Sequence, residues 1–154
     1  MTQSRPLTPG ETDLAHGIFG AAIDYAPVRI VRRKWAFFQP RQTVMAPTGN
    51  IHFHPKGTLY RDDFANAPRS DQGLFLHEMT HIWQHQLGVN LPLKRHPFCR
   101  YDYAIRPGQP LNRYGLEQQA EIVRHTFLLR CGCTVAGAPP LAQYETILPF
   151  AHTG

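Results

Sequence analysis

The architecture expected for the chain depends on one segment, Leu74-Phe-Leu-His-Glu-Met-Thr-His-Ile-Trp-Gln-His85. Apolar residues stand on both sides of its polar centre, and they recur at helical spacing. Ser70 or Asp71 can cap such a helix and Gly88 can stop it, so we expect a helix from about residue 70 to 87. Its core face would carry four apolar side chains: Phe75, Met79, Ile82 and Trp83.

The polar centre of this helix has the pattern His-Glu-x-x-His, with His77, Glu78 and His81. Side chains four residues apart on a helix share one face, so both imidazoles can bind one Zn²⁺ at about 2.0–2.1 Å. Glu78 would point to the open side of the metal and take a proton from an activated water. Two surface histidines are the alternative. Polar groups within so apolar a helix need a reason, however, because unpaired burial is costly, and we therefore predict a zinc site.

A catalytic zinc ion usually has a third protein ligand, which must come from elsewhere in the chain. The metzincin pattern is absent, because positions 84 and 87 hold Gln and Leu instead of the Gly and His that it requires. His85 shares the helix side of His77 but lies two turns away, too far along the axis to bind the same ion. We therefore expect the third ligand on another helix.

A second helix is expected from about Tyr114 to Gly132, and it carries Glu117 and Glu121 on one face. Glu117 can supply the third ligand. Glu121 can accept a hydrogen bond from the free ring nitrogen of a zinc-bound histidine and thereby orient it. The alternative is that both glutamates are solvated and pair with Arg113 and Arg124.

The rest of the chain completes a single α+β domain spanning residues 1–154. Thr8-Pro-Gly-Glu11 predicts a capping box and a helix to about Ile23. Residues 28–54 are rich in β-branched and aromatic residues and favour strands, with Thr43–Ala46 and Ile51–Phe53 as two short candidates. We expect a small, mostly antiparallel sheet packed on the His-Glu-x-x-His helix and on the second ligand-bearing helix. Residues 89–113 read as a long functional loop, and a short last helix follows Pro140.

Composition limits the partners and the location of the chain. Its 154 residues carry a net charge of +5, which could favour acidic partners such as cell-wall polymers, anionic lipids or nucleic acid. We interpret the one short basic cluster, residues 32–34, as solvated surface, and no nucleic-acid motif appears, so we predict no nucleic-acid partner. Three cysteines (Cys99, Cys131 and Cys133) suggest reduced thiols. No stretch resembles a signal peptide or a membrane span, so we expect a cytoplasmic location by default, no stable membrane insertion, and export only by a signal-independent route.

The combination of these motifs resembles the gluzincin metallopeptidases, the thermolysin-like clan. More closely, residues 77–85 together with Glu117-Gln-Gln-Ala-Glu121 resemble compact bacterial minigluzincin proteins, some of which look related to domains found with contractile injection and type VI secretion systems. The opening segment, residues 7–30, resembles the same group. The resemblance implies His77, His81 and Glu117 as metal ligands, Glu78 as base and Glu121 as their support, and it implies a secretion-apparatus partner.

One part of the gluzincin pattern has no counterpart here. Full-length proteases of that clan have a large helical domain that supplies a transition-state donor, often His or Tyr. The candidates in this chain lie in or beside the long loop: Tyr101, Tyr103, His96 and Tyr114. We predict Tyr103 as the donor. The alternative is that Tyr101 and Tyr103 simply pack over the domain.

The reaction that we predict is hydrolysis of a peptide bond in a peptide or protein substrate. An extended segment would add to a sheet edge, at Thr43–Ala46 or Ile51–His54. A zinc amidase acting on peptidoglycan is one alternative, which the basic charge would suit. A non-catalytic zinc-binding module associated with secretion is another, although a purely structural site needs no base at position 78.

Overall fold

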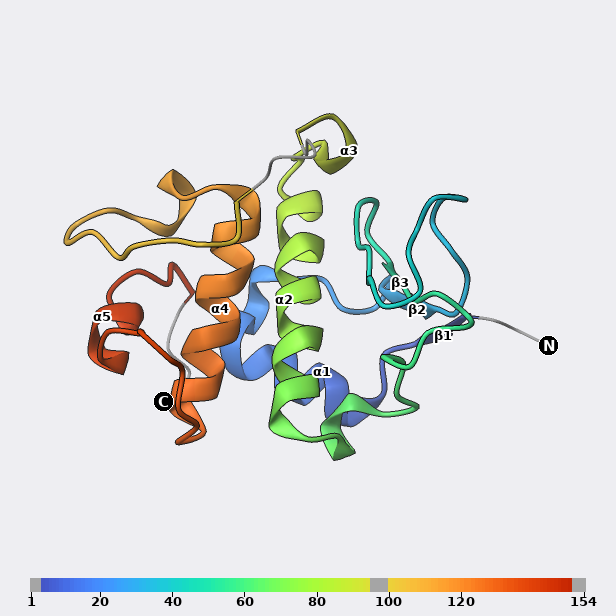
Figure 1. Ribbon diagram of the computed structural model, residues 1–154, viewed down its shortest axis with the longest axis horizontal. Helices are drawn as coiled ribbons and strands as arrows, with labels where there is room; N and C mark the ends of the chain where they lie inside the picture. The colour runs from blue at the N-terminus through green and yellow to red at the C-terminus, as the bar shows by residue number, and fades with distance from the viewer. Residues whose placement is uncertain (1–3, 95–99, 151–154) are drawn as a thin grey trace.

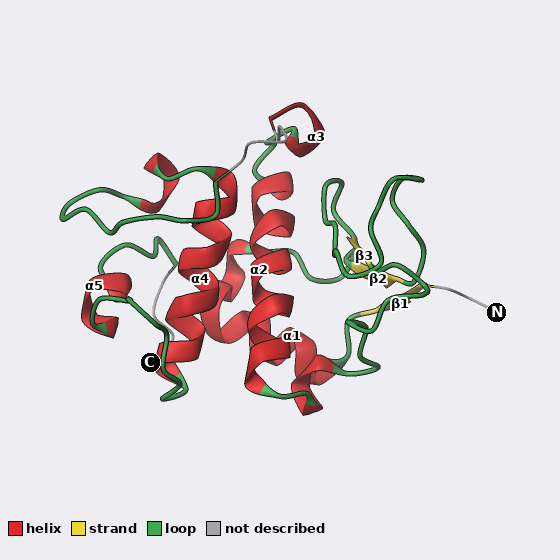
Figure 2. Cartoon of the chain, in the orientation of Figure 1, coloured by secondary structure: helices red, strands yellow, loops and turns green. Residues whose placement is uncertain are grey.

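The structure is a computed structural model that describes residues 4–94 and 100–150. Its helices are α1 (Pro9–Phe19), α2 (Arg69–Gln86), α3 (Leu91–Lys94), α4 (Leu116–Arg130) and α5 (Leu141–Glu145), and its strands are β1 (Ser4–Pro6), β2 (Arg29–Val31) and β3 (Ile51–His52). Short 3₁₀ segments span Gly20–Ala22, Phe64–Asn66 and Leu111–Arg113. α2 and α4 run antiparallel side by side, and the sheet lies on the side of α2 away from α4 (Figure 1). The predicted α+β class is confirmed (Figure 2).

The sheet is as small as expected, and it is mixed. β2 is its central strand, antiparallel to β1 and parallel to β3. The expected strand at Thr43–Ala46 is reduced to one antiparallel bridge between Met45 and His52, whose backbone groups exchange hydrogen bonds of 3.1 and 2.7 Å. β1 was not expected, because three residues that include a proline show no strand pattern of their own.

The aromatic residues after β2 do not continue the strand, which corrects the prediction from their composition. Residues 33–38 form bends and turns instead. The Gln39 side chain explains this course: its Oε1 accepts a hydrogen bond from Trp35 N at 2.8 Å, and its Nε2 donates to Thr43 O and His52 O at 2.8 and 2.9 Å. These bonds turn the chain back towards β3, so strand propensity is overridden by a side chain that ties the loop together.

Helix ends follow the predictions at α1 and depart from them at α2. Thr8 and Glu11 form the predicted capping box, with bonds of 3.0 and 2.9 Å. α2 begins after Pro68 without a side-chain cap, so Ser70 and Asp71 lie inside its first turn instead of capping it. Proline there fixes an extended backbone from which the helix can start. α4 falls within the predicted range of 114–132.

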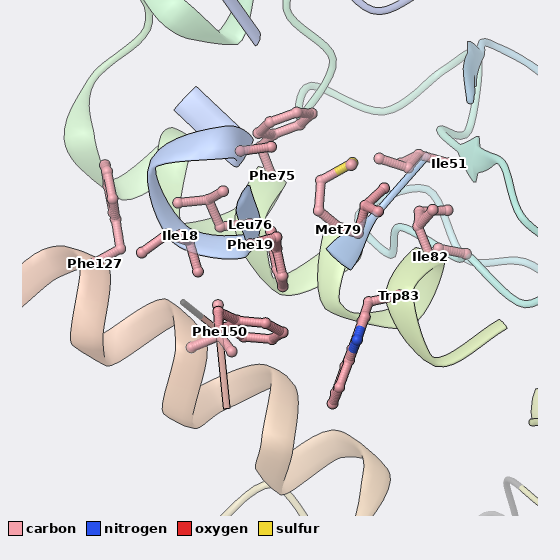
Figure 3. Close-up of a cluster of buried hydrophobic side chains, with 14 of the residues drawn as sticks. Ile18, Phe19, Ile51, Phe75, Leu76, Met79, Ile82, Trp83, Phe127 and Phe150 are labelled. Atoms are coloured by element: carbon pink, nitrogen blue, oxygen red, sulfur yellow. The ribbon is translucent and has the colours of Figure 1, made fainter. Parts of the chain in front are cut away.

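α2 is the central element of the core. Twelve of its eighteen residues are buried, including all four predicted core positions. Figure 3 shows Met79 and Ile82 of α2 beside Ile51 of β3, with Trp83 facing Phe150. Gly73 lies on the side of α2 that faces α4, where an added Cβ would come within 3.3 Å of Arg124 Cγ. The helix that carries the histidines is therefore fixed by contacts on almost every side.

Residues 89–113 contain α3 and a 3₁₀ turn at Leu111–Arg113, so the expected loop is partly structured. His96 and Cys99 lie outside the described residues. Cys131 and Cys133 form no disulfide within the described part of the chain. In the same part, no helix combines the length and the apolar character that crossing a bilayer would require.

The buried Glu11 carboxylate joins three segments, and its replacement should destabilise the fold. It accepts hydrogen bonds from both Arg5 Nη atoms at 2.8 and 3.0 Å, from Thr8 N, and from Phe64 N at 2.9 Å. We expect Glu11→Gln to cost about 3 kcal/mol, or roughly 10 °C of melting temperature, because its amide group cannot accept all of these bonds. Thermal unfolding followed by circular dichroism measures this. The matched control is Asp71→Asn in the exposed pair with Arg61, expected to cost under about 1 kcal/mol. Equal losses in the two variants would contradict the anchoring role.

Candidate metal centre

Two histidines of α2 and one glutamate of α4 meet where the two helices pack. His77 and His81 lie one helical turn apart, with ring centroids separated by 5.2 Å. Glu117, in the first turn of α4, directs its carboxylate at both rings: Oε1 lies 3.4 Å from His77 Nε2 and contacts His81 Nε2. Only 7%, 2% and 1% of the His77, His81 and Glu117 side chains are exposed. We call these three residues the triad.

The arrangement of the triad suits a tetrahedral metal ion. Ligand atoms at about 2.0–2.2 Å from a tetrahedral zinc lie about 3.4 Å from one another. His77 Nε2 and Glu117 Oε1 have this separation, and one nitrogen or oxygen atom from each residue lies within 4.8 Å of the other two. Two imidazoles and a carboxylate, all buried, are therefore placed to hold one metal ion. The donor set matches that of zinc hydrolases with an open fourth position.

Glu78 lies next to the triad without belonging to it. Glu78 is 5% exposed, and its Oε1 lies 4.0 Å from His77 Nε2. Its place in the chain explains this position, because a residue directly after His77 is turned by about 100° around the helix. A carboxylate so close to the ligand atoms can accept a proton from a water molecule at the open side of the site.

Glu121 makes a hydrogen bond with Nδ1 of His77, the ring nitrogen that does not face Glu117. Its Oε2 lies 2.9 Å from His77 Nδ1, and since an ionised carboxylate only accepts hydrogen bonds, the ring nitrogen donates. This bond turns Nε2 of the same ring towards the centre of the triad. The expected contact between Glu121 and a ring nitrogen is therefore present, with Arg124 at 3.8 Å on its other side.

Gln84 makes a hydrogen bond with Nδ1 of His81, a contact that was not predicted from the sequence. Its Oε1 lies 2.8 Å from His81 Nδ1, and its Nε2 donates to Leu116 O at 3.0 Å and to Gln119 Oε1 at 2.9 Å. The Gln84 amide thus connects α2 to Leu116, the first residue of α4, which directly precedes Glu117. A polar residue three positions after a ligand histidine, on a helix this apolar, is the sequence signal that could have identified it.

Removing the Gln84 amide should weaken metal binding without abolishing it. We expect Gln84→Leu to lower zinc affinity by about 10- to 100-fold, because His81 loses the bond that sets its tautomer and its direction. Competition with a fluorescent zinc chelator measures the affinity. Gln86→Leu is the matched control, since Gln86 is exposed and bonds to Asp24 instead. If both variants bind zinc like the wild type, Gln84 does not support the site.

The charges around His77 favour a cation in the site. Burial lowers the pKa of His77, but hydrogen bonds to Glu117 and Glu121 and the charge of Glu78 more than compensate and raise it to about 9. Burial would raise the pKa of Glu121, yet its bond to His77 lowers it overall. The carboxylates of Glu78, Glu117 and Glu121 therefore favour the protonated form of His77 when no metal is bound. A metal ion would have to displace this proton.

The tyrosine candidates for a transition-state donor lie in different surroundings. Tyr103 OH is 2.5 Å from His125 Nδ1 and 2.6 Å from Tyr144 OH, and burial raises its pKa. The Tyr101 ring lies over His77, with centroids 6.0 Å apart and planes tilted by 18°. Tyr114 OH accepts a hydrogen bond from Arg106 N at 3.0 Å. No distance to a substrate tests these residues, and Tyr103 as donor stays a prediction.

A cavity of about 510 Å³ reaches Glu121, although no residue of the triad itself lines it. Glu121, the carboxylate that bonds to His77, forms part of its wall, and Tyr101 and Tyr103 line it as well. Residues 135–139 and Tyr144 of α5 also line it. Space for part of a ligand is therefore available next to Glu121, one hydrogen bond away from the triad.

An α+β fold in which a His-Glu-x-x-His helix meets a glutamate from a neighbouring helix defines the zincin-like class of metal-binding domains, as the sequence predicted. No model of a protein family matches the chain. The solved structure of the effector domain of VgrG2b from Pseudomonas aeruginosa, however, superposes with a TM-score of 0.74 at 37% sequence identity, covering 92% of this chain and 80% of that one. The chain therefore belongs to the family of the VgrG2b effector domain.

The full-length relative is the type VI secretion system spike protein VgrG2b of Pseudomonas aeruginosa PAO1. This chain is 42% identical to it, over an alignment that covers 80% of this chain. The same alignment covers 13% of the spike protein, so the chain corresponds to a small part of that relative. The predicted resemblance to domains found with type VI secretion is confirmed.

Proposed function

We propose that the chain is a zinc-dependent peptidase. The observation that carries this proposal is the buried triad with a further carboxylate, Glu78, 4.0 Å from one of its ligand atoms. A bound Zn²⁺ would polarise the scissile carbonyl and make a water molecule more acidic. A site that only stabilised the fold would need no additional carboxylate at this position.

The residues of the chain would divide the remaining tasks. Glu78 would take a proton from the attacking water and pass it to the leaving amine. Glu121 and Gln84 would keep both imidazoles turned with Nε2 towards the ion. Tyr103 remains our proposed donor to the developing oxyanion, which would require its hydroxyl to exchange one of its present partners for the substrate.

The substrate would reach the site along the sheet and into the adjoining cavity. His52 of β3 already exchanges backbone bonds with Met45, so a peptide cannot pair with β3 at that residue. The outer side of the segment 43–46 is the edge that we propose for an extended substrate. A side chain near the scissile bond would enter the cavity lined by Tyr101, Tyr103 and Tyr144.

Digestion of casein and of a peptide library, read by mass spectrometry, tests the proposal. We expect cleavage by the zinc-loaded chain, loss of cleavage with a chelator and recovery with added Zn²⁺. Digestion of cell-wall sacculi in parallel would reveal an amidase instead. A chain that binds about one zinc ion and cleaves neither substrate would contradict the enzymatic proposal and favour a binding module.

We also propose that the chain is delivered by, or with, a type VI secretion spike. The support is the family relationship, since the curated relative is itself a spike protein. Such delivery would be the signal-independent export that the sequence left open. The apparatus would then be the partner of the chain, and a peptide or protein at the destination its substrate.

A further inference from the structure

Positive charge is concentrated in one part of the chain. Residues 25–61 contain no Asp or Glu, whereas the remaining residues contain eleven acids and nine Lys or Arg. The segment carries seven cations: Arg29, Arg32, Arg33, Lys34, Arg41, Lys56 and Arg61. The net charge of +5 is therefore distributed unevenly: residues 25–61 are strongly basic, and the rest of the chain is mildly acidic. A field of one sign over one region favours an anionic partner there.

The same region exposes aromatic rings. Phe37 is 88% exposed, more than any other large apolar residue that the structure describes, and Phe38 is 58% exposed. The two rings meet edge to face at 5.5 Å, and Trp35 meets Phe38 in the same way at 6.3 Å. They stand between Lys34 and Arg41 in the chain. We call residues 32–41 the basic-aromatic loop. Neighbouring rings exposed in this way are unfavourable in water and point to a binding surface.

The basic-aromatic loop has a fixed shape. Gln39 is 3% exposed, and its side chain bonds to Trp35 N, Thr43 O and His52 O. A backbone bond from Gln39 N to Ala36 O, 3.0 Å long, closes the turn that carries Phe37 and Phe38. The segment that joins β2 to β3 projects from the sheet end of the molecule, away from α4 and α5 (Figure 1). The exposed rings of Phe37 and Phe38 therefore belong to a projecting segment of the chain.

One further cation, Lys56, acts on the same imidazole as two cations of the basic-aromatic loop. Desolvation together with the positive charges of Lys34, Arg41 and Lys56 lowers the pKa of His54. Lys34 and Arg41 belong to the basic-aromatic loop, and Lys56 follows it in the chain. Arg32 is placed differently, because its guanidinium lies over the Tyr60 ring at 4.5 Å.

We propose that the basic-aromatic loop binds the surface of an anionic phospholipid bilayer. The rings of Phe37, Phe38 and Trp35 would enter the boundary between headgroups and acyl chains, while Arg33, Lys34 and Arg41 contact lipid phosphates. A bilayer accommodates a projecting apolar tip, whereas single-stranded nucleic acid is usually held in a groove with open ring faces for stacking. This proposal does not depend on the peptidase proposal.

Vesicle binding of the full chain tests this directly. Vesicles of phosphatidylcholine mixed with phosphatidylglycerol are compared with vesicles of phosphatidylcholine alone, in a flotation assay and by tryptophan fluorescence. We expect binding to the anionic vesicles, weakened by salt, with a blue shift in emission as Trp35 leaves water. Trp83 is 8% exposed and should contribute little to the shift. Equal binding to both kinds of vesicle, or to neither, would overturn the proposal.

Paired variants separate the loop from the rest of the surface. The double variant Phe37→Ser/Phe38→Ser should lower partitioning by at least about tenfold, whereas Leu87→Ser, at a 64% exposed residue after α2, should leave it unchanged. Arg33→Gln/Lys34→Gln should lower it by about tenfold or more, and Arg106→Gln/Arg113→Gln, at exposed sites of equal charge elsewhere, should not. Loop variants that behave like their controls would overturn the proposal.

Heparin provides the remaining control. It carries dense negative charge but offers no apolar layer for the rings. If the wild type binds heparin as tightly as anionic vesicles and the Phe37→Ser/Phe38→Ser variant keeps both affinities, charge alone explains the binding and the lipid proposal is wrong. A loss confined to vesicles in that variant would support insertion of the rings.

Discussion

Glu78→Gln is expected to reduce peptide hydrolysis by about 10²- to 10⁴-fold while metal binding is retained. The amide keeps the size of the side chain but cannot take a proton from water, and residue 78 lies beside the triad without contributing to it. Peptide cleavage rates, measured with metal content on the same preparation, test both halves of this expectation.

Two comparisons make the Glu78 experiment decisive. Glu145→Gln changes a carboxylate that pairs with Arg130 near α5, and it should leave the rate unchanged. If Glu78→Gln hydrolyses peptides at the wild-type rate, the base lies elsewhere. If the variant loses its metal as well as its activity, Glu78 serves the site mainly by its charge and not by transferring a proton.

Glu117→Ala is expected to lower zinc affinity by more than about 100-fold. The side chain is 1% exposed and its carboxylate faces both imidazoles, so its removal leaves two ligands and an empty space between α2 and α4. Zinc should raise the melting temperature of the wild type, because the ion binds the folded state alone, and should not raise that of the variant. Calorimetric zinc titration and thermal unfolding are the measurements.

Glu121→Gln is the comparison variant for Glu117→Ala, because a smaller loss of zinc affinity is expected from it. Its side-chain oxygen can still accept from His77 Nδ1, so affinity should fall less, by about tenfold. Wild-type zinc affinity in Glu117→Ala would rule out the triad as the metal site. An equal loss in both variants would indicate that the local charge matters more than the ligand itself.

The two long helices, α2 and α4, and their candidate ligands could be predicted from the sequence. His77, His81 and Glu117 stand out because helical spacing constrains where side chains four residues apart can point, and α2 and α4 are long enough to show that spacing. Their meeting could be expected only from the chemistry of a three-ligand site and from the family resemblance, since no local pattern states which helices pack together. The structure brings them together as expected.

The sheet region was less predictable, because its local signals are weak. β1 and β3 span three and two residues, too few to display an alternating pattern. Trp35, Phe37 and Phe38 have strong strand propensity, yet the side-chain bonds of Gln39, one local and one to His52, decide their course. Gln84 was missed although its bond to His81 is local, because the partners of its amide nitrogen lie more than thirty positions away.

The burial of α2 has a consequence for which ion the site can choose. Phe75, Met79 and Ile82 are buried and fix the rotation of this helix, so the core sets the side of α2 from which both imidazoles project, before any ion binds. Such a site cannot widen to the six to eight oxygen ligands that calcium takes, nor offer magnesium its octahedral shell. Packing behind the ligands would thus disfavour these two ions, and a polypeptide that unfolds and folds again would recover the same geometry without any ion as a template.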